Sequence, residues 1–240
     1  MKINSYISID LETTGLNPKL DRIIEIGAAK VVDGQIVDTF ETLVNPGRKL
    51  EERITDLTGI TDGDLTDKPY IEDVLPALFA FMEDELPLLG HSILFDFSFL
   101  KKAAVDRKLN FEKWGVDTLK IARKYLPELP HRSLGYLCNF YRIPHQAHRA
   151  LNDAEATHLL YQRLVSEFYK EEEDLFDRHQ LQFRVKRDTP VTIPQKEQLY
   201  RLMKQHNLTV DVDVERLTRS EASRLTDQLL ATCQKREIHL

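Results

Sequence analysis

The sequence of 240 residues has little of several features that would mark a specialised class of protein. It contains two cysteines, Cys138 and Cys233, which lie far apart and outside any CxxC motif. This argues against a disulfide framework or a zinc knuckle and fits a reducing compartment. No apolar run has the length that a signal peptide or a membrane span requires. We therefore expect a soluble, cytoplasmic protein without a membrane partner.

An excess of positive charge is also lacking. The net charge is −6 and the isoelectric point is about 5.8, whereas proteins that grip long duplex DNA usually carry a basic surface. Either nucleic acid is not the partner, or binding is local and bound cations supply the positive charge. The sequence also lacks a GxxxxGK[ST] phosphate loop, a GxSxG elbow and a GxGxxG fingerprint, which removes support for other common mechanisms.

The periodicity of apolar residues predicts alternating strands and helices. Strands are expected at residues 3–9, 23–32 and 35–44, and Asp33 and Gly34 form a tight turn that joins the last two as a hairpin. This order is typical of an α/β layered domain that begins with three antiparallel strands. The other predicted elements are helices at 50–57, 71–84, 95–107, 118–125, 133–141 and 152–169, and short strands at 86–89 and ending at 116–117.

A change in composition after residue 170 predicts a second unit. We expect a main domain over residues 1–170, a charged connector over 171–191 and a small helical module over 192–240. Within the module, Thr218 and Glu221 have the spacing of a capping box at the start of a helix. The module is small for an independently stable fold.

Asp10 and Glu12 occupy alternate positions of an apolar strand. Because successive side chains of a strand point to opposite faces, both carboxylates lie on one face. They repel each other unless a cation lies between them, and Mg²⁺ or Mn²⁺ prefers such oxygen ligands. An exposed strand end would show the same alternation, but Thr13, Thr14 and Gly15 add small residues and free backbone amides where a nucleotide could approach.

Two further acidic residues lie at predicted starts of helices. Asp96 follows His91 at a strand-to-helix junction. It would be either a buried charge with a partner or an ordinary acid in the first turn of a helix. Asp153 follows His148 across a short loop, and would either join a metal site or cap the helix. His145 and His148 form an HxxH pair, but a zinc site is not expected because no third soft ligand is near in sequence.

These segments, taken in order, resemble the three motifs of the DnaQ-like, or DEDDh, exonuclease family. The matching residues are Asp10 with Glu12, then Asp96, then His148 with Asp153. The likeness is close to the proofreading domains of bacterial replicative polymerases and covers roughly residues 3–168, including the segments at 21–28, 43–46 and 57–61. Ser92 departs from the pattern, since many relatives carry asparagine there, which weakens detailed claims about contacts near His91.

The resemblance implies a ribonuclease H-like mixed sheet flanked by helices and a metal-dependent 3′–5′ exonuclease that releases nucleoside 5′-monophosphates. His148 would be the general base. Two divalent ions, Mg²⁺ or Mn²⁺, would be held by Asp10, Glu12, Asp96 and Asp153. The expected substrate-binding residues are Thr13, Thr14, Gly15, Leu16, His91 and Phe95.

Several alternatives stay open at this point. The expected substrate is single-stranded DNA or a frayed 3′ end, with RNA as the alternative, and a non-catalytic adaptor is a rival from another class. Leu16 and Phe95 would pack on bases or in the core, and Arg149 would contact phosphate or stay a solvated surface residue. Residues 192–240 carry no catalytic cluster, and would dock a polymerase, a helicase or nucleic acid, or would simply stabilise the main domain.

Overall fold

The computed structural model describes residues 2–82, 85–170 and 174–238, and it divides into two compact units. The larger unit comprises the residues up to Pro46 together with Leu50–Val185, and the smaller comprises Gly47–Lys49 together with the chain from Lys186 onward. Of the helices in the described part of the chain, none combines the length and the apolar character needed to cross a bilayer.

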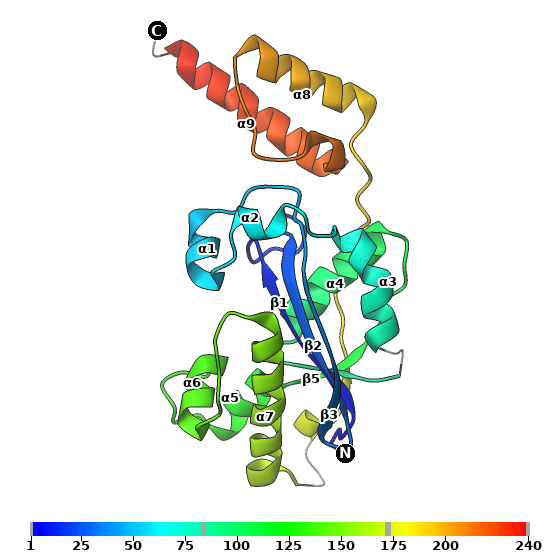
Figure 1. Ribbon diagram of the computed structural model, residues 1–240, viewed down its shortest axis with the longest axis vertical. Coiled ribbons are helices and arrows are strands. Elements are labelled where there is room, and N and C mark those ends of the chain that lie inside the picture. Colours follow the sequence, from blue (N-terminus) through cyan, green and yellow to red (C-terminus); the bar gives the residue numbers. More distant parts are fainter. Residues whose placement is uncertain (1, 83–84, 171–173, 239–240) are drawn as a thin grey trace. The chain divides into compact units, whose positions relative to one another are not determined.

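The larger unit is built on a mixed sheet (Figure 1), whose six strands follow the order β3-β2-β1-β4-β5-β6. β2 is antiparallel to both β1 and β3, β1 is parallel to β4, β4 is parallel to β5, and β6 is antiparallel to β5. The strands are β1 (Tyr6–Thr13), β2 (Ile23–Val32), β3 (Gln35–Leu43), β4 (Leu88–Gly90), β5 (Trp114–Asp117) and β6 (His179–Gln180). This confirms the predicted fold class, a ribonuclease H-like mixed sheet flanked by helices.

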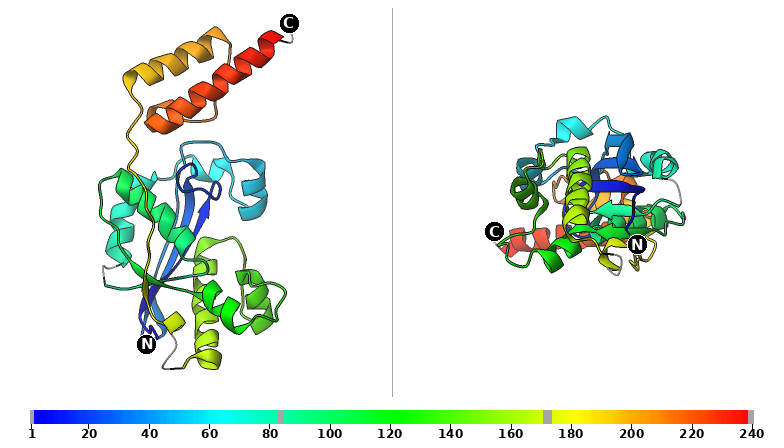
Figure 2. Two further views of the ribbon diagram at one scale, coloured as in Figure 1. Left: turned by 180° about the vertical axis from the view of Figure 1, so that it is seen from behind. Right: turned by 90° about the horizontal axis from the view of Figure 1, so that it is seen from below.

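Helices cover both faces of this sheet (Figures 1 and 2). One face is covered by α3 (Ile71–Met82) and α4 (Leu94–Asp106), and the other by α5 (Thr118–Tyr125), α6 (Leu134–Tyr141) and α7 (Ala150–Phe168). Two shorter helices, α1 (Glu52–Thr58) and α2 (Asp62–Leu65), pack on a small cluster that includes Ile24 of β2.

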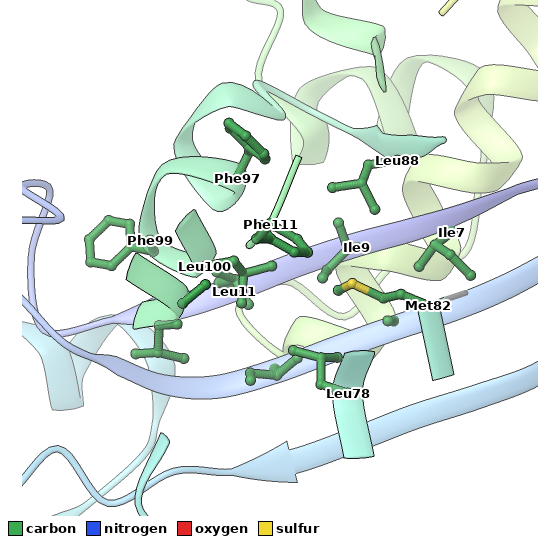
Figure 3. Close-up of a cluster of buried hydrophobic side chains, with 14 of the residues drawn as sticks. Ile7, Ile9, Leu11, Leu78, Met82, Leu88, Phe97, Phe99, Leu100 and Phe111 are labelled. Carbon is green, nitrogen blue, oxygen red and sulfur yellow. The ribbon is translucent and has the colours of Figure 1, made fainter. Parts of the chain in front are cut away.

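The alternation of side chains along β1 decides which residues face which helices. Ile7, Ile9 and Leu11 enter the core beneath α3 and α4, together with side chains such as Leu78 and Phe97 (Figure 3). Burying side chains of this size contributes about 1.5–3 kcal/mol each. The residues between them in sequence point toward α7 on the opposite face of the sheet.

Two polar contacts hold α7 against that opposite face. The hydroxyl of Ser8 donates to the carbonyl oxygen of Ala154 at 2.6 Å, and the hydroxyl oxygen of Tyr6 lies 2.8 Å from Nδ1 of His158. The same face continues to Asp10 and Glu12, so the beginning of α7 is brought toward these two acids.

β2 and α5 have the predicted bounds, and the other predicted elements are found with boundaries shifted by a few residues. The first strand was expected to end at residue 9, but β1 continues to Thr13, because its ladder with β2 extends from Tyr6 to Thr13 with an irregularity at its end. The predicted hairpin turn is confirmed, with positive φ angles of 49° at Asp33 and 79° at Gly34. Within the predicted connector, residues 174–176 form a 3₁₀ helix and β6 pairs with β5.

The smaller unit has its own apolar core, to which α8 (Ile193–Gln205), α9 (Arg219–Ile238) and the segment between them all contribute. The predicted capping box is confirmed: the amide of Thr218 donates to Oε2 of Glu221 at 2.9 Å, and the amide of Glu221 donates to Oγ1 of Thr218 at 3.3 Å. The segment 47–49 is part of this unit, because Arg48 forms an ion pair of 2.5 Å with Glu221 and the amide of Lys49 donates to the carbonyl of Asp211.

Candidate functional site

Three carboxylates converge where β1 meets the start of α7. Asp10 and Glu12 come from β1, and Asp153 comes from the first turn of α7. One oxygen of each carboxylate lies within 4.8 Å of the others. The strand alternation and the contact of α7 with β1 therefore bring together the acids of the first and third predicted motifs.

The cluster is electrostatically unfavourable without a cation. Burial raises the pKa of Asp10 well above its ordinary value, and Asp96, Asp153 and Glu12 raise it further. Burial also raises the pKa of Glu12 to about 7, with added effects of Asp153 and Glu25. Closely spaced carboxylates cost free energy when they ionise together, and a cation between them removes that cost.

Asp96 is attached to the same strand from the other helical layer. It lies in the first turn of α4, its side chain is buried, and its Oδ1 accepts a hydrogen bond of 3.1 Å from the backbone amide of Leu11. Burial raises its pKa more than the hydrogen bonds from the amides of Asp96 and Leu11 lower it. Asp96 is therefore a buried acid with a long-range partner, which favours the first of the two interpretations open from the sequence.

The donor set fits a hard divalent cation. Carboxylate oxygens are the ligands that Mg²⁺ and Mn²⁺ prefer, whereas zinc sites usually include histidine or cysteine. Asp10, Glu12 and Asp153 present the oxygens. A cation bound between them would offset the repulsion that opposes their joint ionisation. The site can therefore hold a metal ion.

The two histidines before α7 differ in their contacts with Asp153. The imidazole of His145 contacts Oδ1 of Asp153 through Nε2, and both side chains are largely buried. The backbone amide of His148 instead donates a hydrogen bond of 2.9 Å to Oδ2 of Asp153. His148 is exposed and adopts a left-handed conformation with φ of 65°. The sequence pointed to His148 and missed the contact of His145, although the HxxH spacing marked both.

The loop after β1 is closed by internal hydrogen bonds. Thr13 Oγ1 donates to the carbonyl of Gly15 at 2.6 Å, and the amide of Thr14 donates to the carbonyl of Arg22 at 2.8 Å. The expectation of free amides was therefore wrong for Thr14. Thr13, Thr14 and Gly15 are buried, whereas Leu16 is 85% exposed.

The second motif carries residues with structural contacts of their own. Both ring nitrogens of His91 are engaged, Nδ1 at 2.9 Å from Thr118 Oγ1 and Nε2 at 2.7 Å from the carbonyl oxygen of Arg132. Phe95 is partly buried and packs on Phe99, with ring centroids 5.0 Å apart. The substrate-binding roles of His91 and Phe95 stay predictions.

Glu25 and Arg149 form a contact that the sequence did not predict. Glu25 Oε1 accepts a hydrogen bond of 3.0 Å from Nε of Arg149, whose Nη2 donates to Glu41 Oε1 at 3.2 Å. The guanidinium of Arg149 is thus paired with two carboxylates while its side chain stays 43% exposed, and its contact with phosphate stays a prediction. The signal in the sequence was the single acid inside the apolar run of β2.

Comparisons with known proteins agree with this geometry. Residues 7–161 match the family model for exonucleases called RNase_T. The chain is 40% identical over 173 residues to a PolC-type DNA polymerase III of Oceanobacillus iheyensis, covering 70% of this chain and 12% of that protein. It is 39% identical over 165 residues to the PolC-type enzyme of Thermotoga maritima, covering 67% and 12%. The chain thus matches 12% of the length of these relatives.

Solved structures show the same fold. Exonuclease X in complex with 5′ overhanging duplex DNA is similar with a TM-score of 0.58 and 28% identity, over 71% of this chain and 99% of that one. The nuclease domain of 3'hExo, a DEDDh family member bound to rAMP, has a TM-score of 0.59 and 20% identity, over 69% and 93% of the two chains. At that identity the second likeness supports the fold alone.

Proposed function

This chain belongs to the exonuclease family, and from that premise we propose that it is a metal-dependent 3′–5′ exonuclease that removes nucleotides one at a time from DNA ends. The match covers 12% of the length of the PolC-type relatives, so the activity of those whole proteins remains a proposal for this chain. Proofreading, repair and DNA turnover all use this reaction.

The observation that carries the proposal is the convergence of acids from separate elements. Oxygens of Asp10, Glu12 and Asp153 lie within 4.8 Å of one another, and Asp96 is bonded to the strand between Asp10 and Glu12. Such a cluster is costly to ionise in the folded protein. Carboxyl groups with strongly perturbed pKa values cluster at functional sites, which supports a cation that acts in the reaction.

The acids would hold two divalent ions, Mg²⁺ or Mn²⁺, in the proposed reaction. Bound ions of this kind lower the pKa of the attacking water and stabilise the charge on the scissile phosphate and leaving oxygen. Asp10, Glu12 and Asp153 would supply the clustered oxygens, and Asp96, bonded to the same strand, would supply one from the opposite helical layer. The positive charge of the ions would also let an acidic protein bind a strand end.

His148 is proposed as the general base. Its exposure and its backbone hydrogen bond to Asp153 support this role, in which a neutral imidazole nitrogen would accept the proton of the attacking water. The water oxygen forms a bond to phosphorus as the bond to the 3′ oxygen breaks. The products are a nucleoside 5′-monophosphate and a strand shortened by one nucleotide.

The proposed substrate is single-stranded DNA or a frayed 3′ end. Exonuclease X, at 28% identity, is described in complex with overhanging duplex DNA, which supports DNA for this chain. Thr13 to Gly15 would line the terminal nucleotide, and Leu16, at 85% exposure, has the free apolar surface to pack on a base. His91 and Phe95 would complete this wall, and RNA is the alternative that a direct assay separates.

A gel assay on matched DNA and RNA strands labelled at the 5′ end tests the proposal. We expect a ladder shortened from the 3′ end with Mg²⁺ or Mn²⁺, none with EDTA, and none with Asp10→Ala. Faster digestion of RNA would overturn the choice of DNA. Absence of cleavage by folded protein under every metal would favour the non-catalytic adaptor.

The smaller unit is proposed to dock a macromolecular partner. Its exposed Ile193, at 68% exposure, and Tyr200, at 46%, lie on α8. The PolC-type relatives make a replicative polymerase the first candidate, and the comparisons give no support to a helicase. Ile193→Lys should weaken retention of purified polymerase without lowering the melting temperature. Unchanged retention by this variant would favour a unit that only stabilises the protein.

A further inference from the structure

Glu25 is a buried acid that belongs to none of the three acidic motifs. It lies on β2 directly across the ladder from Glu12, and its side chain is 0% exposed. A buried carboxylate is costly unless it is paired and hydrogen-bonded. Its partners therefore show what this charge is used for.

Both oxygens of Glu25 bind the start of α7. Oε1 accepts from Nε of Arg149 at 3.0 Å, and Oε2 accepts from the backbone amide of Ala150 at 3.1 Å. Arg149 is the N-terminal capping position of the helix and Ala150 is its first residue. A carboxylate at this end also interacts favourably with the helix dipole. Glu25 thus holds the helix end at two adjacent points.

The backbone of β2 contacts the same helical turn two residues further along. A Cβ atom at Gly27 would lie 2.0 Å from the amide nitrogen of Leu151 and 2.1 Å from the carbonyl carbon of Ala150. Gly27 pairs with Asp10 in the ladder with β1. The absence of a side chain at Gly27 and the carboxylate of Glu25 together fix the first turn of α7 beside the acids of β1.

This attachment lies between the two residues of the third motif. Asp153 follows within the same turn, with its amide bonded to the carbonyl of Arg149 at 2.9 Å, and its Oδ2 accepts from the amide of His148. Because both oxygens of Glu25 accept hydrogen bonds from Arg149 and Ala150, Glu25 acts on the site through these two residues. Any shift at Arg149 and Ala150 therefore moves both Asp153 and His148 relative to Asp10.

We propose that Glu25 is a positioning residue for the reaction, whose buried carboxylate anchors the first turn of α7 so that Asp153 and His148 face the acids of β1. This inference rests on the proposed exonuclease function. Substitution of a residue that orients metal ligands without binding the metal usually lowers metal affinity or activity about 10–100-fold.

Glu25→Gln is the test variant, because it keeps the size of the side chain and one acceptor for the amide of Ala150 but loses the negative charge. We expect kcat on single-stranded DNA to fall about 10–100-fold with KM little changed. Mn²⁺ affinity, read from the metal-induced rise in melting temperature without substrate, should weaken about 10–100-fold. Glu41→Gln removes the exposed partner of Arg149 and should match wild type in both measurements.

Arg149→Gln serves as a second variant if Glu25→Gln does not fold, and it should change both readouts in the same direction. A lower melting temperature in EDTA with unchanged kcat and Mn²⁺ affinity would overturn the proposal and leave a purely stabilising ion pair. If wild type lacks exonuclease activity, the proposed function fails. The Mn²⁺ titration then still shows whether Glu25 positions Asp153, because it needs no turnover.

Discussion

The backbone amide of Leu11 donates a hydrogen bond of 3.1 Å to Oδ1 of Asp96. Leu11 lies between Asp10 and Glu12 on β1, and Asp96 lies 85 residues later in the first turn of α4. The bond therefore fixes the acid of the second motif on the strand that carries the first. It also explains how an acid in the α3 and α4 layer reaches a site that the strand presents toward α7.

Replacement of Asp10 by asparagine should separate its catalytic role from its effect on stability. We expect Asp10→Asn to lose activity by about 10²–10³-fold, a typical cost of removing a group that stabilises transition-state charge. The variant should melt at a higher temperature than wild type in EDTA, because one charge leaves a cluster in which burial and Asp96 raise the pKa of Asp10.

Differential scanning fluorimetry in EDTA and with Mn²⁺ checks this expectation. Mn²⁺ should raise the melting temperature of wild type more than that of Asp10→Asn, since ligand binding to the folded state stabilises it. Asp211→Asn, an exposed acid of the smaller unit, is the matched control and should respond to Mn²⁺ like wild type. Equal Mn²⁺ responses of Asp10→Asn and wild type would contradict a metal role for Asp10.

Single substitutions of the two histidines should show which of them accepts the proton. His148→Ala should lower kcat about 10²–10⁴-fold, the usual contribution of a general base. His145→Ala should lower kcat by the smaller factor of about 10–100-fold, because its imidazole contacts Asp153 and orients a proposed metal ligand. Steady-state kinetics on a single-stranded oligonucleotide would compare them. A larger loss in His145→Ala than in His148→Ala would reverse the assignment.

Gly27 should tolerate no side chain. Gly27→Ala places a methyl group 2.0 Å from the amide nitrogen of Leu151, so β2 and α7 must separate. We expect the free energy of unfolding to fall by about 3 kcal/mol or more, at the upper end for an overpacked core. Gly63→Ala meets an ordinary contact of 3.6 Å and should change stability by about 1 kcal/mol or less. Urea denaturation of both variants measures the difference, and equal stabilities would contradict the close contact.

The buried imidazole of His158 should make the protein less stable in acid. Burial lowers the pKa of His158 in the folded state, so the unfolded chain binds this proton more readily. Stability is therefore retained above the unfolded pKa of about 6.5 and is lost as the pH falls below it. The hydroxyl oxygen of Tyr6 lies 2.8 Å from Nδ1 of His158. His158→Gln keeps a polar partner for this hydroxyl but does not titrate.

Urea denaturation at pH 7.5 and 5.5, in EDTA, measures this effect. Wild type should lose more stability between the two pH values than His158→Gln. Carboxylates of the acidic cluster titrate in both proteins and cancel in the comparison. Parallel pH profiles would show that His158 binds its proton equally in the folded and unfolded states.

Local patterns of residue type made much of this protein predictable. The apolar run from Ile23 to Val32 matches β2 residue for residue, because a strand buried on both faces needs apolar side chains at nearly every position. Asp33 and Gly34 marked the hairpin because few residues adopt positive φ angles. The spacing of Asp10 and Glu12 placed both acids on one face, since strand side chains alternate.

The sequence by itself determined the elements, the fold class and the identity of the candidate acids, because each depends on residues close together in the chain. Only the tertiary structure decided which side chains meet. Glu25 contacts Ala150 across 125 residues, and His145 rather than the ring of His148 contacts Asp153. Such contacts depend on how β2 and α7 pack and on the path of a loop, and no local periodicity encodes either of them.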